Sequence, residues 1–172
     1  YVILTFEVKV VDFTWLSEAL GSEAAVFIIS MVPVVELRLA IPWGAAIGLS
    51  WFECLFLSVA GNSIIIPFAI LLIRPIFGFL RKLSPFFNKM VDWMEERAMK
   101  KSDTVRKYSM LGLMLLVAVP LPGTGAWTGC IIATLLDMRM KYALPSIVLG
   151  VLIAGILVTG ATYGFLHLTV NL

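Results

Sequence analysis

Glu36-Leu37-Arg38 lies between two apolar runs, residues 24–35 and 39–50, and this charged break constrains the fold more than any other feature. A helix rises about 1.5 Å per residue and the hydrocarbon core of a bilayer is about 30 Å thick, so a leg of about a dozen residues reaches only half way across. The two runs therefore predict a re-entrant helical hairpin with the charges at its tip. Ionised groups at that depth are costly and usually functional.

A second break of the same kind separates residues 111–119 from residues 126–136. Its sequence is Pro120-Leu-Pro-Gly-Thr-Gly125, and prolines and glycines make a continuous helix unfavourable there. The apolar runs 51–73 and 143–168 are long enough to span a bilayer. Each predicted hairpin is therefore followed by one spanning helix.

The first break has an alternative interpretation. Residues 24–50 would form one kinked crossing, since Pro33 and Pro42 each remove a helix hydrogen bond. That arrangement also leaves Glu36 and Arg38 near the centre of the bilayer. We favour the hairpin, because charged and helix-disfavouring residues cluster in this short stretch.

The composition excludes a soluble globular protein. Hydrophobic residues make up 60% of the 172 residues, charged residues 14%, and the mean hydropathy is +1.00. Cys54 and Cys130 lie in different apolar runs without metal-ligand spacing, and no nucleotide-binding loop or nucleophile motif is present. The sequence therefore predicts an integral membrane protein that is not an enzyme and binds no metal or cofactor.

The two broken segments predict an all-α fold with an inverted repeat. Met-Val-Pro33 in the first unit resembles Ala-Val-Pro120 in the second. If each unit crosses the membrane once, the second enters from the opposite face, an arrangement typical of transporters. The expected segments are an N-terminal segment on the outer side (1–23), the first repeat (24–73), an amphipathic linker (74–110) and the second repeat (111–172).

Basic residues set the expected orientation, because short cytoplasmic loops collect Lys and Arg. The linker is rich in them, whereas the opposite side carries Lys9 among acidic residues, so we expect a multi-pass protein with a cytoplasmic linker and both termini outside. An apolar stripe predicts that the linker lies on the membrane surface, divided at Pro85 and attracted to anionic headgroups, not nucleic acid. The basic residues are Arg74, Arg81, Lys82, Lys89, Arg97, Lys100, Lys101, Arg106 and Lys107, and the stripe is Phe79, Leu83, Phe86, Met90 and Trp93.

Arg38 and Glu36 are the candidate functional charges. Arg38 stays protonated and its planar fork matches a phosphate or a carboxylate, so it is a candidate ligand for an anionic substrate. Glu36 is a candidate for proton coupling. The alternative is a purely structural pair at the hairpin tip.

Pro122-Gly123-Thr124-Gly125 provides a second candidate anion site, because the leg that starts near Ala126 points its helix N-terminus at this turn. The alternative is a tight turn that lets two helices pack closely. An inverted repeat would bring this turn and Arg38 together near the midplane. Asn62 is a further candidate, either for binding the substrate or for holding a hairpin tip in place. Trp127 is a candidate for lining the substrate cavity, and the alternative is that it fills the core.

Three motifs together resemble the bacterial and archaeal family of small multidrug export proteins, which is distantly similar to the DedA superfamily. They are Pro33-Val-Val-Glu36-Leu-Arg38-Leu-Ala-Ile-Pro42, Gly61-Asn62 and Pro120-Leu-Pro-Gly-Thr-Gly-Ala-Trp-Thr-Gly129, and the resemblance extends over residues 23–162. It implies a prokaryotic plasma-membrane protein with opposed re-entrant hairpins. It places Glu36 and Arg38 on one tip and residues 122–125 on the other, and leaves open whether Arg139 replaces a DedA arginine.

The DedA likeness implies movement of undecaprenyl phosphate or other phospholipids. Our leading hypothesis is therefore a flippase for an anionic lipid, with Arg38 and the glycine turn holding the headgroup and Glu36 coupling a proton. The alternatives are a proton-coupled exporter of cationic drugs, with Glu36 as the binding carboxylate, and a scaffold that organises lipid. We expect membrane lipids as partners and favour a homodimer.

Overall fold

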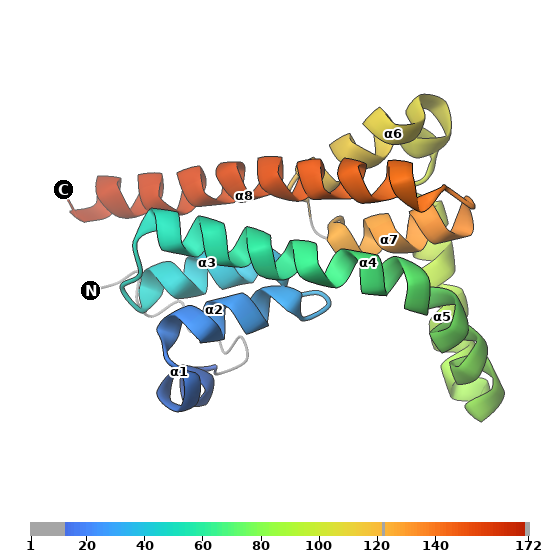
Figure 1. Cartoon of the computed structure of the whole chain (residues 1–172), viewed down its shortest axis with the longest axis horizontal. Coiled ribbons are helices and arrows are strands. Elements are labelled where there is room, and N and C mark those ends of the chain that lie inside the picture. The colour runs from blue at the N-terminus through green and yellow to red at the C-terminus, as the bar shows by residue number, and fades with distance from the viewer. Residues whose placement is uncertain (1–12, 122, 171–172) are drawn as a thin grey trace.

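The computed structural model describes residues 13–121 and 123–170, and every secondary-structure element in them is a helix. Two long helices, α4 (Trp51–Leu83) and α8 (Met140–Val170), run antiparallel along the long axis of the molecule (Figure 1). Both are long and apolar enough to cross a membrane. The predicted all-α fold with two long apolar helices is confirmed, whereas expectations for residues 1–12, 122 and 171–172 lie outside the described residues.

The first predicted break is present at the expected position. Helix α2 (Ser22–Met31) and helix α3 (Glu36–Ala46) are joined by a turn at residues 32–35 and lie side by side at one end of the molecule (Figure 1). The short helix α1 (Thr14–Leu20) precedes them. The two legs are separate helices, so the alternative of one kinked crossing is not what the chain forms.

Small residues let this hairpin approach α4. A Cβ atom at Gly44 of α3 would lie 2.6 Å from the sulfur of Cys54 on α4. At Gly61 of α4, an added Cβ would collide with the hydroxyl of Ser30 and the backbone carbonyl of Phe27. Glycine is required at Gly61 because α4 touches the backbone of α2 there, and at Gly44 because side chains of α2 and α4 occupy the space of a Cβ atom.

The second break also lies where the sequence predicted it, between α6 (Asp103–Ala118) and α7 (Ala126–Leu135). These two legs do not form a closely packed pair, however, because α6 packs mainly along α8 while α7 packs against α4. Gly150 of α8 explains the difference. An added Cβ there would lie 2.7 Å from the carbonyl oxygen of Met114, so the glycine admits α6 to the surface of α8.

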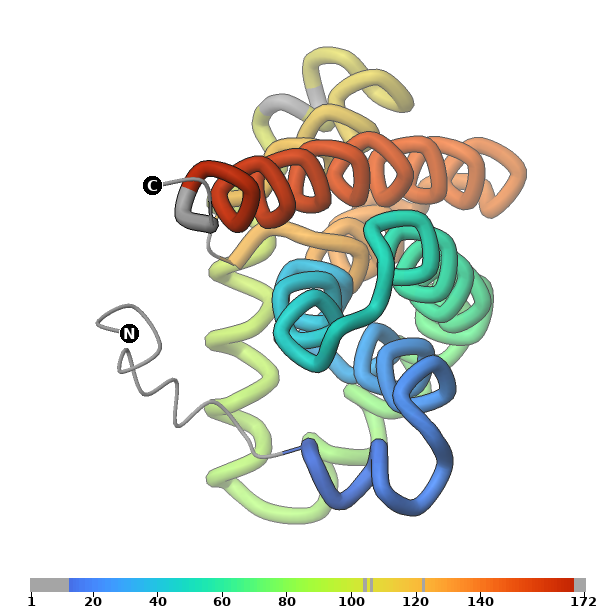
Figure 2. Tube along the Cα trace, turned by 90° about the vertical axis from the view of Figure 1, so that its left-hand side faces the viewer, coloured from blue at the N-terminus to red at the C-terminus, as the bar shows by residue number. Residues whose placement is uncertain are grey.

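The linker contains a continuation of α4 followed by α5 (Pro85–Met99). Helix α4 extends ten residues beyond the predicted run and ends at Leu83; Pro85 opens α5, as expected from its position. Arg81 pairs with Asp92 at 2.8 Å and with Glu95 at 2.9 Å, so α5 is held against the end of α4. Figure 2 shows α5 running across the direction of α4 and α8.

Four of the five residues of the predicted apolar stripe of the linker are exposed in the structure, and the fifth, Met90, is half-buried. The exposed fractions are 66% for Phe79, 54% for Leu83, 71% for Phe86 and 58% for Trp93. An exposed apolar row of this kind beside basic residues fits a membrane surface.

Helices α3 and α7 both start near the middle of the molecule and run away from each other (Figure 1). Their N-terminal ends therefore face one another between α4 and α8. Positive partial charges of two helix ends converge at this point.

Candidate functional site

Glu36 caps the N-terminus of α7 from the start of α3. Its Oε1 accepts the backbone N–H of Trp127 at 3.1 Å and its Oε2 accepts that of Ala126 at 3.3 Å. The first N–H groups of a helix have no partner inside it, so a carboxylate there satisfies two of them. Glu36 is only 4% exposed, which makes it a buried link between segments that are about 90 residues apart.

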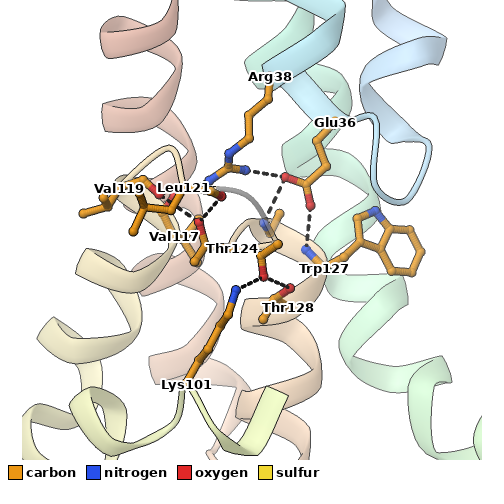
Figure 3. A network of polar contacts seen from close by, with 11 residues as sticks. Glu36, Arg38, Lys101, Val117, Val119, Leu121, Thr124, Trp127 and Thr128 are labelled. Atoms are coloured by element: carbon orange, nitrogen blue, oxygen red, sulfur yellow. Dashed lines mark hydrogen bonds and ion pairs between the residues drawn. The ribbon is translucent and has the colours of Figure 1, made fainter. Parts of the chain in front are cut away.

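Arg38 binds Glu36 and the other side of the break. Nη1 donates to Glu36 Oε2 at 2.6 Å, while Nη2 donates to the carbonyl oxygens of Val117 at 3.0 Å and Val119 at 3.4 Å (Figure 3). Those carbonyls belong to the last turn and C-cap of α6. The ion pair therefore lies across the α6–α7 break with the cation at a helix C-terminus and the anion at a helix N-terminus, the favourable polarity.

The backbone at the hairpin tip is strained. Glu36 has φ +50° and Val34 has φ +75°, values that side-chain-bearing residues rarely adopt. Such conformations cost on the order of 1–3 kcal/mol each and are kept only where the surroundings hold them. At Glu36 the contacts with Arg38 and α7 provide that hold.

The connection between α6 and α7 approaches the ion pair so closely that Gly125 admits no side chain. A Cβ atom there would lie 2.6 Å from both Arg38 Nη1 and Glu36 Oε1. The hydroxyl of Thr124 shares its one proton between the carbonyl oxygens of Val119 at 2.9 Å and Leu121 at 2.8 Å. Thr124 therefore ties the connection to the end of α6.

Two further cations reach the connection from the linker. Lys101 Nζ donates to the carbonyl oxygen of Gly123 at 2.5 Å, and a Cβ at Gly123 would lie 2.7 Å from Arg97 Nη2. Arg38 and Lys101 approach from opposite sides (Figure 3). Partial burial, followed by the charges of Arg97 and Arg38, lowers the pKa of Lys101. The junction is therefore strongly electropositive, with one buried carboxylate as its counter-charge.

A family profile matches residues 36–157, from Glu36 itself to the second half of α8. The family is described as "Putative small multi-drug export protein". This chain belongs to that family. No curated protein and no solved structure gave a significant match. Family membership, together with the apolar helices α4 and α8, makes the chain a membrane protein of a transporter family.

The region shared with the small multi-drug export family contains the whole junction. Of the residues predicted from the sequence, the structure brings together Glu36, Arg38, Gly123, Thr124, Gly125 and Trp127. Trp127 contributes its backbone N–H, whereas its indole Nε1 is buried and has no hydrogen-bond partner in the described part of the chain.

Asn62 and Arg139 lie outside this network. Asn62 is fully buried in α4, and neither atom of its side-chain amide has a partner among the described residues. Arg139 lies in the connection after α7, at the end opposite to Glu36. Within residues 13–121 and 123–170 no group of histidine, cysteine and carboxylate side chains is arranged to hold a metal ion.

The sequence interpretation missed Arg97 and Lys101 as members of the site. Both were assigned to the membrane surface with the other linker cations. No spacing in the sequence relates them to Gly123, because Lys101 is 22 residues away and reaches it only through the turn between α5 and α6.

Proposed function

We propose that this protein transports an anionic lipid, of the class of undecaprenyl phosphate or a phospholipid, across the plasma membrane through the junction of α3, α6 and α7. One observation carries the proposal. The carboxylate of Glu36 sits where a phosphate would bind, held by the Arg38 guanidinium and two N–H groups of α7. An incoming phosphate requires the same donors, so Glu36 acts as an internal occupant that the headgroup displaces.

The surrounding charge supports an anionic substrate. Arg38, Arg97 and Lys101 all lie at the α6–α7 connection, and Glu36 pairs with the first of them, Arg38. A cationic ligand at this position would have to overcome three like charges. An anionic headgroup would gain from each of them.

Protonation of Glu36 provides a physical route to coupling. A neutral carboxyl group no longer forms the ion pair with Arg38 and accepts hydrogen bonds more weakly. The donors at α7 and Arg38 then become free for the headgroup, so substrate entry accompanies proton uptake. Release of the proton restores the Glu36–Arg38 pair and expels the substrate.

The lengths of three of the four helices at the two breaks support half-crossings of the membrane, whereas the fourth, α6, has 16 residues. Helices α2, α3 and α7 contain 10, 11 and 10 residues. At about 1.5 Å per residue they span about half of a hydrocarbon core of about 30 Å. In our proposal they enter from opposite faces as an inverted repeat, with a cytoplasmic linker and both chain ends outside, and alternating access exposes the junction to each side in turn.

Thermal unfolding in detergent tests the proposal, because a ligand that binds only the folded state raises Tm. We expect undecaprenyl phosphate to raise the Tm of the wild type and to have a much smaller effect on Arg38→Lys, which keeps the charge but loses the bidentate fork. Arg74→Ala is the matched control, because Arg74 also binds a helix end and a carboxylate but lies at the far end of α7. An equal shift in wild type and Arg38→Lys, or no shift in the wild type, would contradict the proposal.

Export of cationic compounds is the second candidate, because the family description refers to multi-drug export and the Glu36 carboxylate could bind a cation. The same assay separates the two. A cationic dye that stabilises the wild type and Arg38→Lys but not Glu36→Gln would assign Glu36 as a drug-binding carboxylate.

A further inference from the structure

We infer that the C-terminal half of α8 carries the surface on which a second copy of this chain binds. Four glycines recur along this helix, and two of them are used inside the chain. A Cβ atom at Gly150 would lie 2.7 Å from the carbonyl oxygen of Met114, and one at Gly155 would lie 2.8 Å from Val59 Cγ2.

The other two glycines, Gly160 and Gly164, face open space. No atom of the described residues lies within 4 Å of a Cβ atom added at either position. They are one turn apart in the Gly-x-x-x-Gly spacing that lets two membrane helices approach through their backbones. Within the described residues, the helix-packing function of Gly150 and Gly155 thus has no counterpart at Gly160 and Gly164.

A groove accompanies these glycines. It has a volume of about 280 Å³ between the start of α4 and the end of α8, and its lining includes Trp51, Leu55, Thr159, Gly160, Tyr163 and Gly164. The Tyr163 hydroxyl donates to the carbonyl oxygen of Leu49 at 2.6 Å, which fixes one wall.

Thr159 provides an independent indication of a partner with polar atoms. Its side chain lines the groove, is 5% exposed, and its Oγ1 has no hydrogen-bond partner in the described part of the chain. A buried hydroxyl in apolar surroundings requires an acceptor. A lipid acyl chain can fill the groove but offers no acceptor, whereas the backbone of a facing helix does.

A second copy of α8 meets these requirements. The Lys and Arg residues of the linker give every copy the same orientation in the membrane, so the α8 helices of two copies run parallel. A parallel pair is the arrangement in which Gly-x-x-x-Gly helices cross closely. In this homodimer Gly160 and Gly164 of the two copies are in contact, and each Thr159 hydroxyl donates to a backbone carbonyl of the partner helix.

Light scattering of the full-length protein in detergent, combined with energy transfer between labelled copies, tests this interface. We expect a dimeric wild type and monomeric Gly160→Leu and Gly164→Leu. Gly78→Leu is the matched control, since Gly78 of α4 also has no atom within 4 Å of an added Cβ, and it should stay dimeric. Unchanged Tm values would show that the monomeric variants are folded.

Thr159→Val tests the hydrogen bond without changing the shape of the side chain. We expect the dissociation constant of the dimer to rise about eightfold, because the substitution removes two such bonds, one from each copy, of about 0.6 kcal/mol each. A monomeric wild type would overturn the proposal and leave the groove to a lipid chain. A dimer that persists in both Gly160→Leu and Gly164→Leu would also overturn it and place the interface elsewhere. Neither result depends on whether Arg38 binds a phosphate.

Discussion

Glu36 and Arg74 cap opposite ends of helix α7. The Glu36 carboxylate accepts N–H groups of Ala126 and Trp127, and Arg74 Nη2 donates to the carbonyl oxygen of Thr134 at 2.6 Å. The two charges match the helix dipole, with the anion at the positive end and the cation at the negative end. Helix α7 is therefore held at both ends by side chains from the first half of the chain.

These two caps should differ in their effect on stability. The Arg38 side chain that balances Glu36 is 16% exposed, whereas that of Arg74 is 59% exposed. Arg38→Ala leaves a buried carboxylate without its partner and should lower the free energy of unfolding by about 3–5 kcal/mol. Arg74→Ala should cost less than about 1 kcal/mol, because an exposed pair is screened by solvent. Unfolding in mixed micelles measures both, and similar losses would contradict the structure.

Glu36 and Arg38 should be energetically coupled. Glu36→Gln, Arg38→Gln and the double variant form a cycle, and contacting charged residues usually give a coupling of about 0.5–3 kcal/mol. The double variant should be more stable than the sum of the single losses predicts, since it leaves no unpaired charge. The same micelle unfolding assay provides the four values. Additive losses would mean that the pair at 2.6 Å contributes nothing as a pair.

Gly125→Ala should disrupt the junction. Its methyl group would collide with the Glu36 carboxylate and the Arg38 guanidinium, neither of which has room to retreat without losing a cap. Gly48→Ala is the control, because Gly48 has φ +90° and no atom within 4 Å of an added Cβ. The control should cost roughly 1–2 kcal/mol from backbone strain alone, and Gly125→Ala should cost more. Equal losses in Tm would remove the steric argument.

Lys101 should give a specific pH dependence. Partial burial, together with the positive charges of Arg97 and Arg38, lowers its pKa below the ordinary value of 10.5. The unfolded state then binds more protons than the folded state between the lowered pKa and 10.5, so the free energy of unfolding rises with pH across that window. The difference between wild type and Lys101→Met should increase as the pH is raised to 10.5. A constant difference would show that neither burial nor the two guanidinium charges lowers the pKa of Lys101.

The positions of the two breaks could be predicted from the sequence because their residues are locally incompatible with an apolar helix. The length of α4 could not be predicted in the same way. Hydropathy falls after Ile73, where Arg74, Arg81 and Lys82 begin, yet these are good helix formers and the helix continues to Leu83. Hydropathy reports which residues suit the bilayer core, whereas a helix ends only where its capping and backbone geometry require it.

Two of the four charged residues of the candidate site, Glu36 and Arg38, could be predicted, whereas Arg97, Lys101 and the backbone partners could not. Glu36 and Arg38 are unusual in an apolar sequence whatever the fold. Their acceptors and donors are backbone groups of α6 and α7, which no side-chain pattern identifies. The sequence also did not predict that α6 packs on α8 and not on α7, since this packing depends on one close approach at Gly150.

The positive φ of Glu36 sets the direction in which the chain enters α3. Rotation about the N–Cα bond of Glu36 turns the preceding residues relative to its side chain, whereas that side chain keeps its place relative to Arg38 and α7. Glu36 is therefore both the residue at which the turn at residues 32–35 meets α3 and the residue that ties α3 to α7. The hairpin tip thus has the construction of a hinge whose axis lies in a residue bound to the second half of the chain.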